Sequence, residues 1–373
     1  MASVEKDPTR RKTPWVVRWR DEAGKQRKQG FARKVDADRH RAKVEHQLAT
    51  GAYVDPAAGR VTFEAYAEQW RAMQPHRPNT AARTRSQLAR HVYPVLGSRP
   101  LAQIQASELQ AFVTGLSVAP SSVRPIWATV RAILSAAVRD RRIQYDPADR
   151  VKLPELPRQQ ISPLTVEQVD RLAGAMPARY RAFVVVGAAT GLRQGELFGL
   201  QVADVDFLRR TLTVERQVQP GQGGAVEPGP LKNRHSYRTL PVGRVVVDAL
   251  AAHLEAYGSR GREAYVFRDD DGQPLHRNRF NRHVWAPARV AAGLPEVTCH
   301  DMRHFYASVL IGAGHNPKAV AERLGHADPA MTLRVYTHLW PSDEDRTRQA
   351  IDDVFAGSGK KSSVPTMRPS REA

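Results

Sequence analysis

The sequence is short of cysteine and has no long apolar run. Cys299 is the one cysteine among 373 residues, which excludes an internal disulfide framework and a zinc site built from several cysteines. No stretch of about 18 apolar residues occurs, as a membrane-spanning helix would require. The first residues, MASVEKDPTRRK, lack the apolar core of a signal peptide. We therefore expect a cytosolic protein that has no membrane partner.

Acidic residues are also in short supply. The chain holds 57 lysines and arginines against 38 acidic residues, which gives a net charge of +19 and a pI near 10.5. Residues 1–150 carry 27 of those basic residues and 14 acidic ones, so 13 of the 19 excess charges lie in well under half the chain. This distribution favours a polyanionic partner such as nucleic acid over a basic surface that serves only solubility.

Length and turn-rich stretches indicate several domains. A chain of 373 residues is too long for one ordinary domain. The stretches 51–60 (GAYVDPAAGR) and 151–164 (VKLPELPRQQISPL) are rich in small residues or proline and predict linkers. They divide the chain into modules at 1–50, 61–150 and 160–355. Residues 356–373 form a low-complexity tail that we expect to be disordered.

The first module has the pattern of a small sheet backed by a helix. Trp15, Val17 and Trp19 alternate with their neighbours in a hairpin expected over 14–31, and a polar helix is expected over 35–48. We expect the aromatic side chains to form the core by packing on that helix. A basic sheet backed by a helix can dock in a major groove of DNA. The side chains predicted to face DNA are Arg18, Arg20, Arg27 and Lys28.

The second module has the pattern of an all-helical domain. Thr62 caps a first helix, and further helices are expected over 80–91, 106–115 and 120–139. A wide apolar stripe along the last of these favours its burial. Arginines on these helices could clamp DNA or could equally form a solvated face. The candidates for DNA contact are Arg83, Arg85, Arg124 and Arg131.

The third module begins with helices that meet at a glycine. An apolar helix over 181–189 stops at Gly191, and Arg193 lies just past that stop. Glu196 follows in a new helical turn.

A short antiparallel sheet is expected next. Its strands lie within 205–214 and 237–242, separated by a glycine-rich excursion over 217–230. Lys232 lies in the turn before the last strand, and a helix over 244–257 follows it.

Residues 300–339, HDMRHFYASVLIGAGHNPKAVAERLGHADPAMTLRVYTHL, concentrate polar groups at helix boundaries. Asn316-Pro317 and Asp328-Pro329 each place a capping residue before a proline, which predicts two helix starts. Gly325 ends the helix between them. Free N–H groups at the start of the first helix in this stretch favour an anion. We expect a phosphate site built from four residues, His300, Arg303, His326 and Tyr336.

Four pieces of the chain, in order, resemble the catalytic domain of the tyrosine recombinase (phage integrase) family. They are ATGLRQGEL with Arg193, PLKNRHSYRTLPV with Lys232, HDMRH with Arg303, and LGHADPAMTLRVYTHL with Tyr336. The first fifty residues resemble the arm-type DNA-binding module of many phage integrases, a three-stranded sheet plus a helix. The resemblance implies an α+β multidomain fold. Its parts would be that module, an all-α core-binding (SAM-like) domain, and a mostly helical catalytic domain with a small antiparallel sheet.

The family chemistry implies a role for each of these residues. Tyr336 would attack a DNA phosphodiester and form a 3′-phosphotyrosyl link, which conserves bond energy for rejoining without ATP, a metal ion or another cofactor. Arginines would hold the phosphate because their bidentate geometry offsets the growing phosphoryl charge. The implied roles are phosphate binding by Arg193 and Arg303, proton transfer by His300 and His326, protonation of the departing 5′-oxygen by Lys232, orientation of Arg193 by Glu196, and helix capping by Asp301.

Some assignments stay open from the residues alone. Tyr306 is a rival nucleophile, although it lies on an apolar stripe, and Arg234 is a rival to Lys232. His304 and His338 are expected behind the site or on the surface. Three positions that carry none of the proposed chemistry depart from the family's common residues: Phe305, Tyr306 and Met331.

The resemblance also implies partners and a setting. The partners are double-stranded DNA attachment sites with core and arm sequences, further copies in a homotetramer, a host DNA-bending protein and an excisionase. The expected activity is integration and excision of a phage or mobile element at the nucleoid of a bacterial host. We expect the C-terminal segment to dock on a neighbouring protomer.

Three alternatives compete with this assignment. One is a catalytically silent DNA-binding or architectural protein of the same fold. Another is a metal-dependent nuclease, for which the acidic run Asp269-Asp270-Asp271 precedes a glycine and favours a turn over a metal site. The third is a type IB topoisomerase, to which the sheet-like N-terminal module is less suited.

Overall fold

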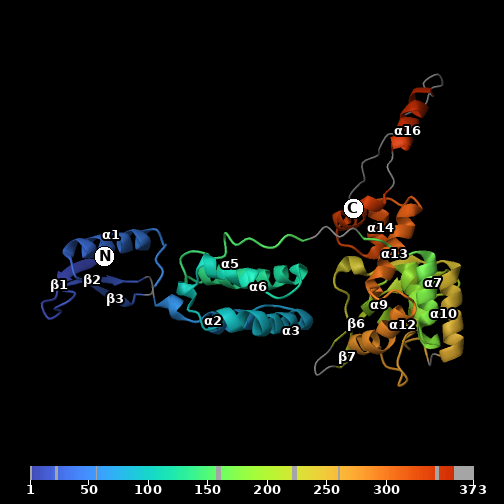
Figure 1. Ribbon diagram of the computed structural model, residues 1–373, viewed down its shortest axis with the longest axis horizontal. Helices are drawn as coiled ribbons and strands as arrows, with labels where there is room; N and C mark the ends of the chain where they lie inside the picture. Colours follow the sequence, from blue (N-terminus) through green and yellow to red (C-terminus); the bar gives the residue numbers. More distant parts are fainter. Residues whose placement is uncertain are drawn as a thin grey trace, which may run out of the picture. The chain divides into compact units, whose positions relative to one another are not determined.

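The computed structural model forms two compact units, Met1–Arg158 and Gln159–Ala373 (Figure 1). It describes residues 2–21, 24–55, 57–156, 161–220, 225–258, 261–340 and 344–356. Beyond Ala356, the tail predicted over 356–373 lies outside the described residues. No helix in the described ranges has the length and apolarity needed to cross a membrane. The predicted α+β fold class is confirmed.

The chain begins with a three-stranded antiparallel sheet covered by a helix. The strands, in the order β1-β2-β3, are Ser3–Lys6, Trp15–Arg20 and Gln26–Phe31, and the helix α1 is Lys34–Ala49. Val17 and Trp19 are buried against α1, and the indole N–H of Trp19 donates to Tyr53 Oη at 3.0 Å. The predicted aromatic core is confirmed. The polar strand β1 carries no alternation and followed only from the family resemblance.

Strand register separates the four basic residues predicted on this sheet. Arg18 lies opposite Lys28, so both project from the face away from α1, and Arg20 shares their strand face. Arg27 lies opposite Trp19 and therefore projects from the face that carries the core. Its guanidinium is ion-paired with two carboxylates, Asp21 and Asp55. The prediction that Arg27 shares the outer face is wrong, because successive side chains along a strand alternate.

The rest of the first unit is helical. Its α-helices α2 to α6 are Phe63–Ala72, Pro78–Gln87, Tyr93–Leu96, Ala106–Thr114 and Pro120–Arg139. Thr62 caps α2 by accepting a hydrogen bond from the Ala65 N–H at 3.3 Å, as predicted. The helix expected over 80–91 is α3 continued by a π-helical turn, Leu88–Val92. The four candidate arginines are all exposed: Arg83, Arg85, Arg124 and Arg131.

The second unit is a helical body with two small sheets. Its α-helices α7 to α10 are Val166–Ala175, Arg181–Thr190, Gln194–Phe198 and Arg244–Tyr257, and α11 to α16 are Arg277–Phe280, Ala286–Ala291, Cys299–Gly312, Pro317–Leu324, Pro329–Tyr336 and Glu344–Ala356. The predicted sheet is β4-β5-β8, with strands Val205–Asp206, Thr211–Val214 and Arg238–Pro241. The excursion expected over 217–230 instead contains a second hairpin, β6 Gln217–Pro220 with β7 Val226–Gly229.

Close packing between α8 and α13 positions the site. Gly187 lies on α8 opposite Met302 of α13, and a Cβ on that glycine would lie only 2.8 Å from Met302 Cε. At the end of α8, Gly191 takes a left-handed conformation with φ of +64°, and a Cβ there would meet the Tyr306 ring at 2.5 Å. These two glycines therefore let the first turns of α13 approach the end of α8.

Candidate active site

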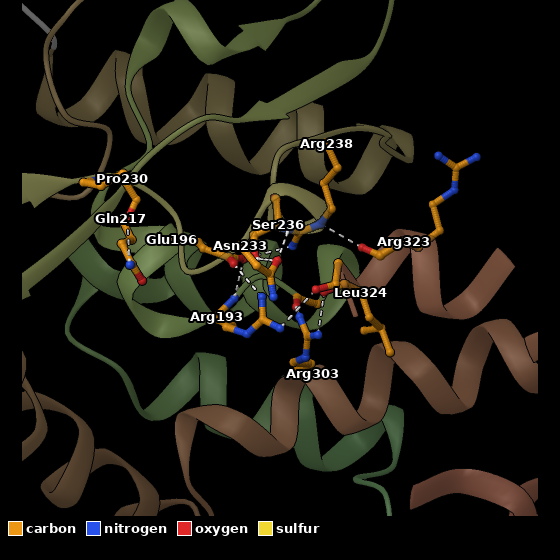
Figure 2. A network of polar contacts seen from close by, with 12 residues as sticks. Arg193, Glu196, Gln217, Pro230, Asn233, Ser236, Arg238, Arg303, Arg323 and Leu324 are labelled. Atoms are coloured by element: carbon orange, nitrogen blue, oxygen red, sulfur yellow. Dashed lines mark hydrogen bonds and ion pairs between the residues drawn. The ribbon is translucent and has the colours of Figure 1, made fainter. Parts of the chain in front are cut away.

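Arg303 forms the buried centre of the site (Figure 2). Its side chain projects from α13, and the residue is 1% exposed. The guanidinium donates to the carbonyl oxygen of Gly191 at 2.8 Å and to that of Leu324 at 2.5 Å. These carbonyls belong to the unsatisfied ends of α8 and α14. Burial, followed by the nearby Arg193 charge, lowers the pKa of Arg303 to about 9, so the group is still a cation at neutral pH.

Glu196 bridges two guanidinium groups beside Arg303, as Figure 2 shows. Arg193 donates to Glu196 Oε1 at 2.8 Å and through its backbone N–H to Oε2 at 3.0 Å, and Arg238 donates to Oε2 at 2.9 Å. Burial of Glu196 opposes its ionisation, but the Arg238 and Arg193 charges outweigh that effect and hold its pKa below the ordinary value. The buried carboxylate fixes the orientation of both arginines.

Arg193 is the more accessible of the two predicted arginines. It is the N-cap residue of α9, and 32% of its side chain is exposed. Its guanidinium also donates to the Gly325 carbonyl at 3.3 Å, which lies at the end of α14. Both predicted arginines thus contact the turn between α14 and α15.

Arg238 was missed by the sequence analysis. Its side chain is 6% exposed and donates to the Arg323 carbonyl at 2.9 Å as well as to Glu196. It lies in β8, where no local pattern distinguishes it from its neighbours. Besides the nearby Ser236 carbonyl, its partners Glu196 and Arg323 are 42 and 85 residues away along the chain, so only the fold reveals its place.

The two predicted histidines lie at adjoining helix ends. His326 follows Gly325, which ends α14 in a left-handed conformation, and His326 Nδ1 lies 2.7 Å from Thr332 Oγ1. Burial, then the Arg303 and Arg193 charges, lowers the pKa of His326 to about 3. His300 is exposed in the first turn of α13, yet loss of hydration on its inner side, followed by His304, lowers its pKa too. Both imidazoles are therefore neutral at neutral pH.

Tyr336 ends α15 and is 1% exposed. Its phenol oxygen lies 2.7 Å from Nδ1 of His304, which projects from α13 one turn after His300. Burial raises the pKa of Tyr336 to about 12, with Arg303 opposing this rise. The phenol is therefore protonated at neutral pH, and the tautomer of His304 decides which of the two groups donates. The four-residue spacing predicts only that His304 shares a helix face with His300, and no sequence signal predicts the contact with Tyr336.

The rival tyrosine is packed within the fold. Tyr306 is 9% exposed and lies against Gly191 and the core residues of α14, as its apolar stripe predicts. Within the described site its phenol forms no hydrogen bond. Burial raises its pKa.

Lys232 and Asp301 lie at the edges of this arrangement. Lys232 is exposed in the bend before the 3₁₀ turn Arg234–Ser236 and β8, as predicted from the sequence. That turn lies against the site, since a Cβ on Gly325 would be 3.0 Å from the carbonyl oxygen of residue 235. Asp301 accepts from the backbone N–H of Thr298 at 2.8 Å and from its hydroxyl at 2.6 Å, and so caps α13. Arg234, the rival to Lys232, is also exposed.

No group of three or more histidine, cysteine, aspartate or glutamate side chains in the described ranges is placed to hold a metal ion. The site consists instead of cationic, phenolic and imidazole groups around helix ends.

Two family models match part of each unit. A model of the phage integrase family matches residues 162–342, and a model of the phage integrase central domain matches residues 63–153. The integrase of Mycobacterium phage FRAT1 is 27% identical over 297 residues, covering 79% of this chain and 89% of that relative. The ICEBs1 integrase of Bacillus subtilis (strain 168) is 27% identical over 253 residues, covering 65% of this chain and 67% of that relative.

Solved structures share the fold. The Tn1549 transposon integrase, in complex with a circular intermediate DNA, superposes with a TM-score of 0.65 at 23% identity and covers 79% of this chain and 99% of that one. A lambda integrase tetramer bound to a Holliday junction gives a TM-score of 0.57 at 19% identity, over 87% of this chain and 96% of that one.

These matches define an enzyme of the tyrosine recombinase class, which breaks and rejoins DNA strands. Within that class, the chain belongs to the phage integrase family and is a site-specific DNA recombinase.

Proposed function

We propose that the protein integrates and excises a phage or other mobile element at attachment sites, with Tyr336 as the nucleophile. The supporting observation is a convergence of chain segments on the turn between α14 and α15. Arg303 donates to the carbonyls of Gly191 and Leu324, and Arg193 donates to that of Gly325, 132 residues away. The Tyr336 phenol at the far end of α15 contacts His304, which follows Arg303 on α13. Two cations, neutral imidazoles and a phenol held in this way suit attack on a phosphodiester.

The arginines provide the electrostatic part of catalysis. A guanidinium has five N–H donors, and Arg303 directs two of its nitrogens to backbone carbonyls, which fixes its plane while leaving other N–H groups for a ligand. The accessible Arg193 can pair with a second phosphate oxygen. Since negative charge grows on those oxygens during attack, preorganised donors stabilise the transition state more than the ground state.

Tyr336 needs a proton acceptor to act. With a pKa of about 12, forming the tyrosinate at pH 7 costs on the order of 7 kcal/mol. A neutral histidine nearby can instead accept the proton as the phenol oxygen bonds to phosphorus. The link formed is a 3′-phosphotyrosyl ester, and the bond between phosphorus and the 5′-oxygen breaks.

Lys232 is the proposed donor to the departing 5′-oxygen. Its exposed ammonium group lies on a flexible stem in a bend whose following turn packs on Gly325, next to His326. A lysine in this place can reach a DNA strand lying over the site and deliver a proton there.

We assign the three sequence modules to three DNA-contacting tasks. The sheet at 1–50 binds arm sequences through Arg18, Arg20 and Lys28, the helices at 61–150 clamp the core site, and residues 160–355 perform the chemistry. The exposed arginines that would contact phosphates in the second module are Arg83, Arg85, Arg124 and Arg131.

Assembly and setting follow from the same assignment. Four copies act together on two sites, as in the lambda integrase tetramer on a Holliday junction. α16 carries an exposed apolar face that includes Ile351 and Val354, and we propose that it docks on a neighbouring protomer. A host DNA-bending protein and an excisionase set the direction of the reaction, which takes place at the nucleoid in the bacterial cytoplasm.

Covalent trapping tests this function. The protein is incubated with fragmented genomic DNA of its host, denatured in detergent, purified and sequenced through its attached DNA ends. We expect the wild type to carry DNA ends of one related sequence, with or without EDTA. Tyr336→Phe should carry no attached DNA. A wild type that binds DNA yet yields no adduct would support the architectural alternative, and an adduct or cleavage product that EDTA abolishes would support a metal-dependent nuclease.

A further inference from the structure

We propose that His304 is the proton acceptor that activates Tyr336 and the acid that returns this proton when the strand is rejoined. The inference rests on the proposed function, since it names a further catalytic group in the same site. From the sequence, His304 is expected behind the site or on the surface, and the family resemblance implies proton transfer by His300 and His326.

The geometry favours His304 over those two histidines. Its Nδ1 lies 2.7 Å from the Tyr336 phenol oxygen. His326 directs its own Nδ1 to Thr332 Oγ1, also at 2.7 Å. The ring of His300 meets the His304 ring edge to face, with centroids 4.8 Å apart.

The carboxylates near the site already accept hydrogen bonds from other groups. Glu196 accepts from Arg193 and Arg238, and Asp301 accepts twice from Thr298. Within the described site, His304 is therefore the base in contact with the attacking oxygen.

The protonation state of His304 suits an acceptor. Burial lowers its pKa, Asp301 opposes this and Arg303 adds to it, so the ring is neutral at pH 7. His300 beside it and Tyr336 across from it are neutral as well. A neutral ring that accepts at Nδ1 carries its proton on Nε2.

The step balances without a further reactant. The phenol O–H bond breaks and its proton passes to His304 Nδ1, while the phenol oxygen bonds to phosphorus. The bond from phosphorus to the 5′-oxygen breaks, and Lys232 protonates that oxygen. In the reverse direction a 5′-hydroxyl attacks the phosphotyrosine, and protonated His304 returns the proton to the leaving phenol oxygen.

The test uses the full chain and a nicked duplex of the sequence recovered by covalent trapping, on which cleavage cannot be reversed. Single-turnover adduct formation is measured from pH 5 to pH 9 for the wild type, His304→Ala, His304→Gln and the control His315→Ala, whose exposed histidine lies in the turn after α13. Thermal melting shows whether each variant is folded.

We expect the wild-type rate to be level above about pH 6.5 and to fall below the His304 pKa as the ring takes up a proton. His304→Ala and His304→Gln should both react about 100-fold more slowly at pH 7. Their rates should climb with pH, because hydroxide must then remove the proton. Added imidazole should rescue His304→Ala, and His315→Ala should match the wild type.

Three results would overturn the proposal. A His304→Ala rate within threefold of wild type with the same pH profile would show that another group takes the proton. Wild-type speed in His304→Gln would show that the side chain only holds Tyr336, because an amide can accept a hydrogen bond but not the proton. If His304→Ala is folded and added imidazole does not restore its rate, His304 does not act simply as a proton acceptor. Absence of a wild-type adduct would instead contradict the proposed function itself.

Discussion

Glu196→Gln is the substitution that tests the buried electrostatics of the site most severely. The carboxylate accepts from two guanidinium groups and one backbone N–H at 2.8 to 3.0 Å, and its side chain is 2% exposed. Glutamine keeps the shape and one carbonyl oxygen. Its NH₂ group, however, would face guanidinium N–H groups, donor against donor, and two positive charges would lose their shared counter-ion.

The magnitude follows from the hydrogen bonds and ion pairs that the substitution removes. Hydrogen bonds to charged groups contribute about 1.5–3 kcal/mol each, and removing one partner of a buried ion pair costs about 3–5 kcal/mol. We therefore expect Glu196→Gln to lower the stability of the second unit by about 3–5 kcal/mol. Since Arg193 also loses its fixed orientation, adduct formation should fall by about 100-fold.

Hydrogen exchange followed by mass spectrometry measures the loss of stability locally, on peptides from α9 and β8. The control is Glu322→Gln, on the exposed face of α14. A second readout is acid sensitivity. The folded-state pKa of Glu196 lies below its ordinary value of 4.5, so its stabilisation is present above that pH and is lost as the pH falls through the folded-state pKa. Glu196→Gln has no carboxylate to protonate, so its stability should not show this loss at low pH. If α9 and β8 were equally protected from hydrogen exchange in Glu196→Gln and Glu322→Gln, the buried carboxylate would not stabilise the site as proposed.

Further predictions concern the other groups of the site and the DNA contacts. Arg303→Lys should slow adduct formation about 100-fold or more in single-turnover assays, because lysine cannot hold two carbonyls and a phosphate in one plane. Gly191→Ala should destabilise the second unit by about 1–3 kcal/mol in urea melts, since the new methyl group meets the Tyr306 ring at a left-handed φ. Arg83→Ala should reduce the slope of log affinity against log salt by about 0.9. Arg27→Ala should leave that slope unchanged and lower the melting temperature, because Arg27 is paired with acidic residues.

Local sequence signals specified the helix boundaries around the site. Asn316 and Asp328 accept hydrogen bonds from the N–H groups of Ala319 and Ala330, each at 2.8 Å, and each precedes a proline in the first turn. Gly325 takes the left-handed conformation that ends α14. Each of these signals acts within four residues, so a sequence pattern is enough to predict it.

Long-range contacts were beyond such patterns. The bond from Arg238 to Glu196 joins residues 42 apart, and the one from Arg27 to Asp55 joins residues 28 apart. The hairpin β6–β7 was missed because its strands, QVQP and VEPG, are only four residues long and each contains a proline. His304 could be placed on the same helix face as His300, but its bond to Tyr336 spans 32 residues and depends on how α15 packs.

The central claim is that Tyr336 forms the covalent bond to DNA. The most direct measurement is to denature the trapped complex, digest it with trypsin and nuclease, and locate the remaining nucleotide by tandem mass spectrometry. We expect the modification on the peptide that begins at Val335, at Tyr336 and as a 3′-phosphotyrosyl ester. A nucleotide on Tyr306, or on a residue outside 300–339, would contradict it.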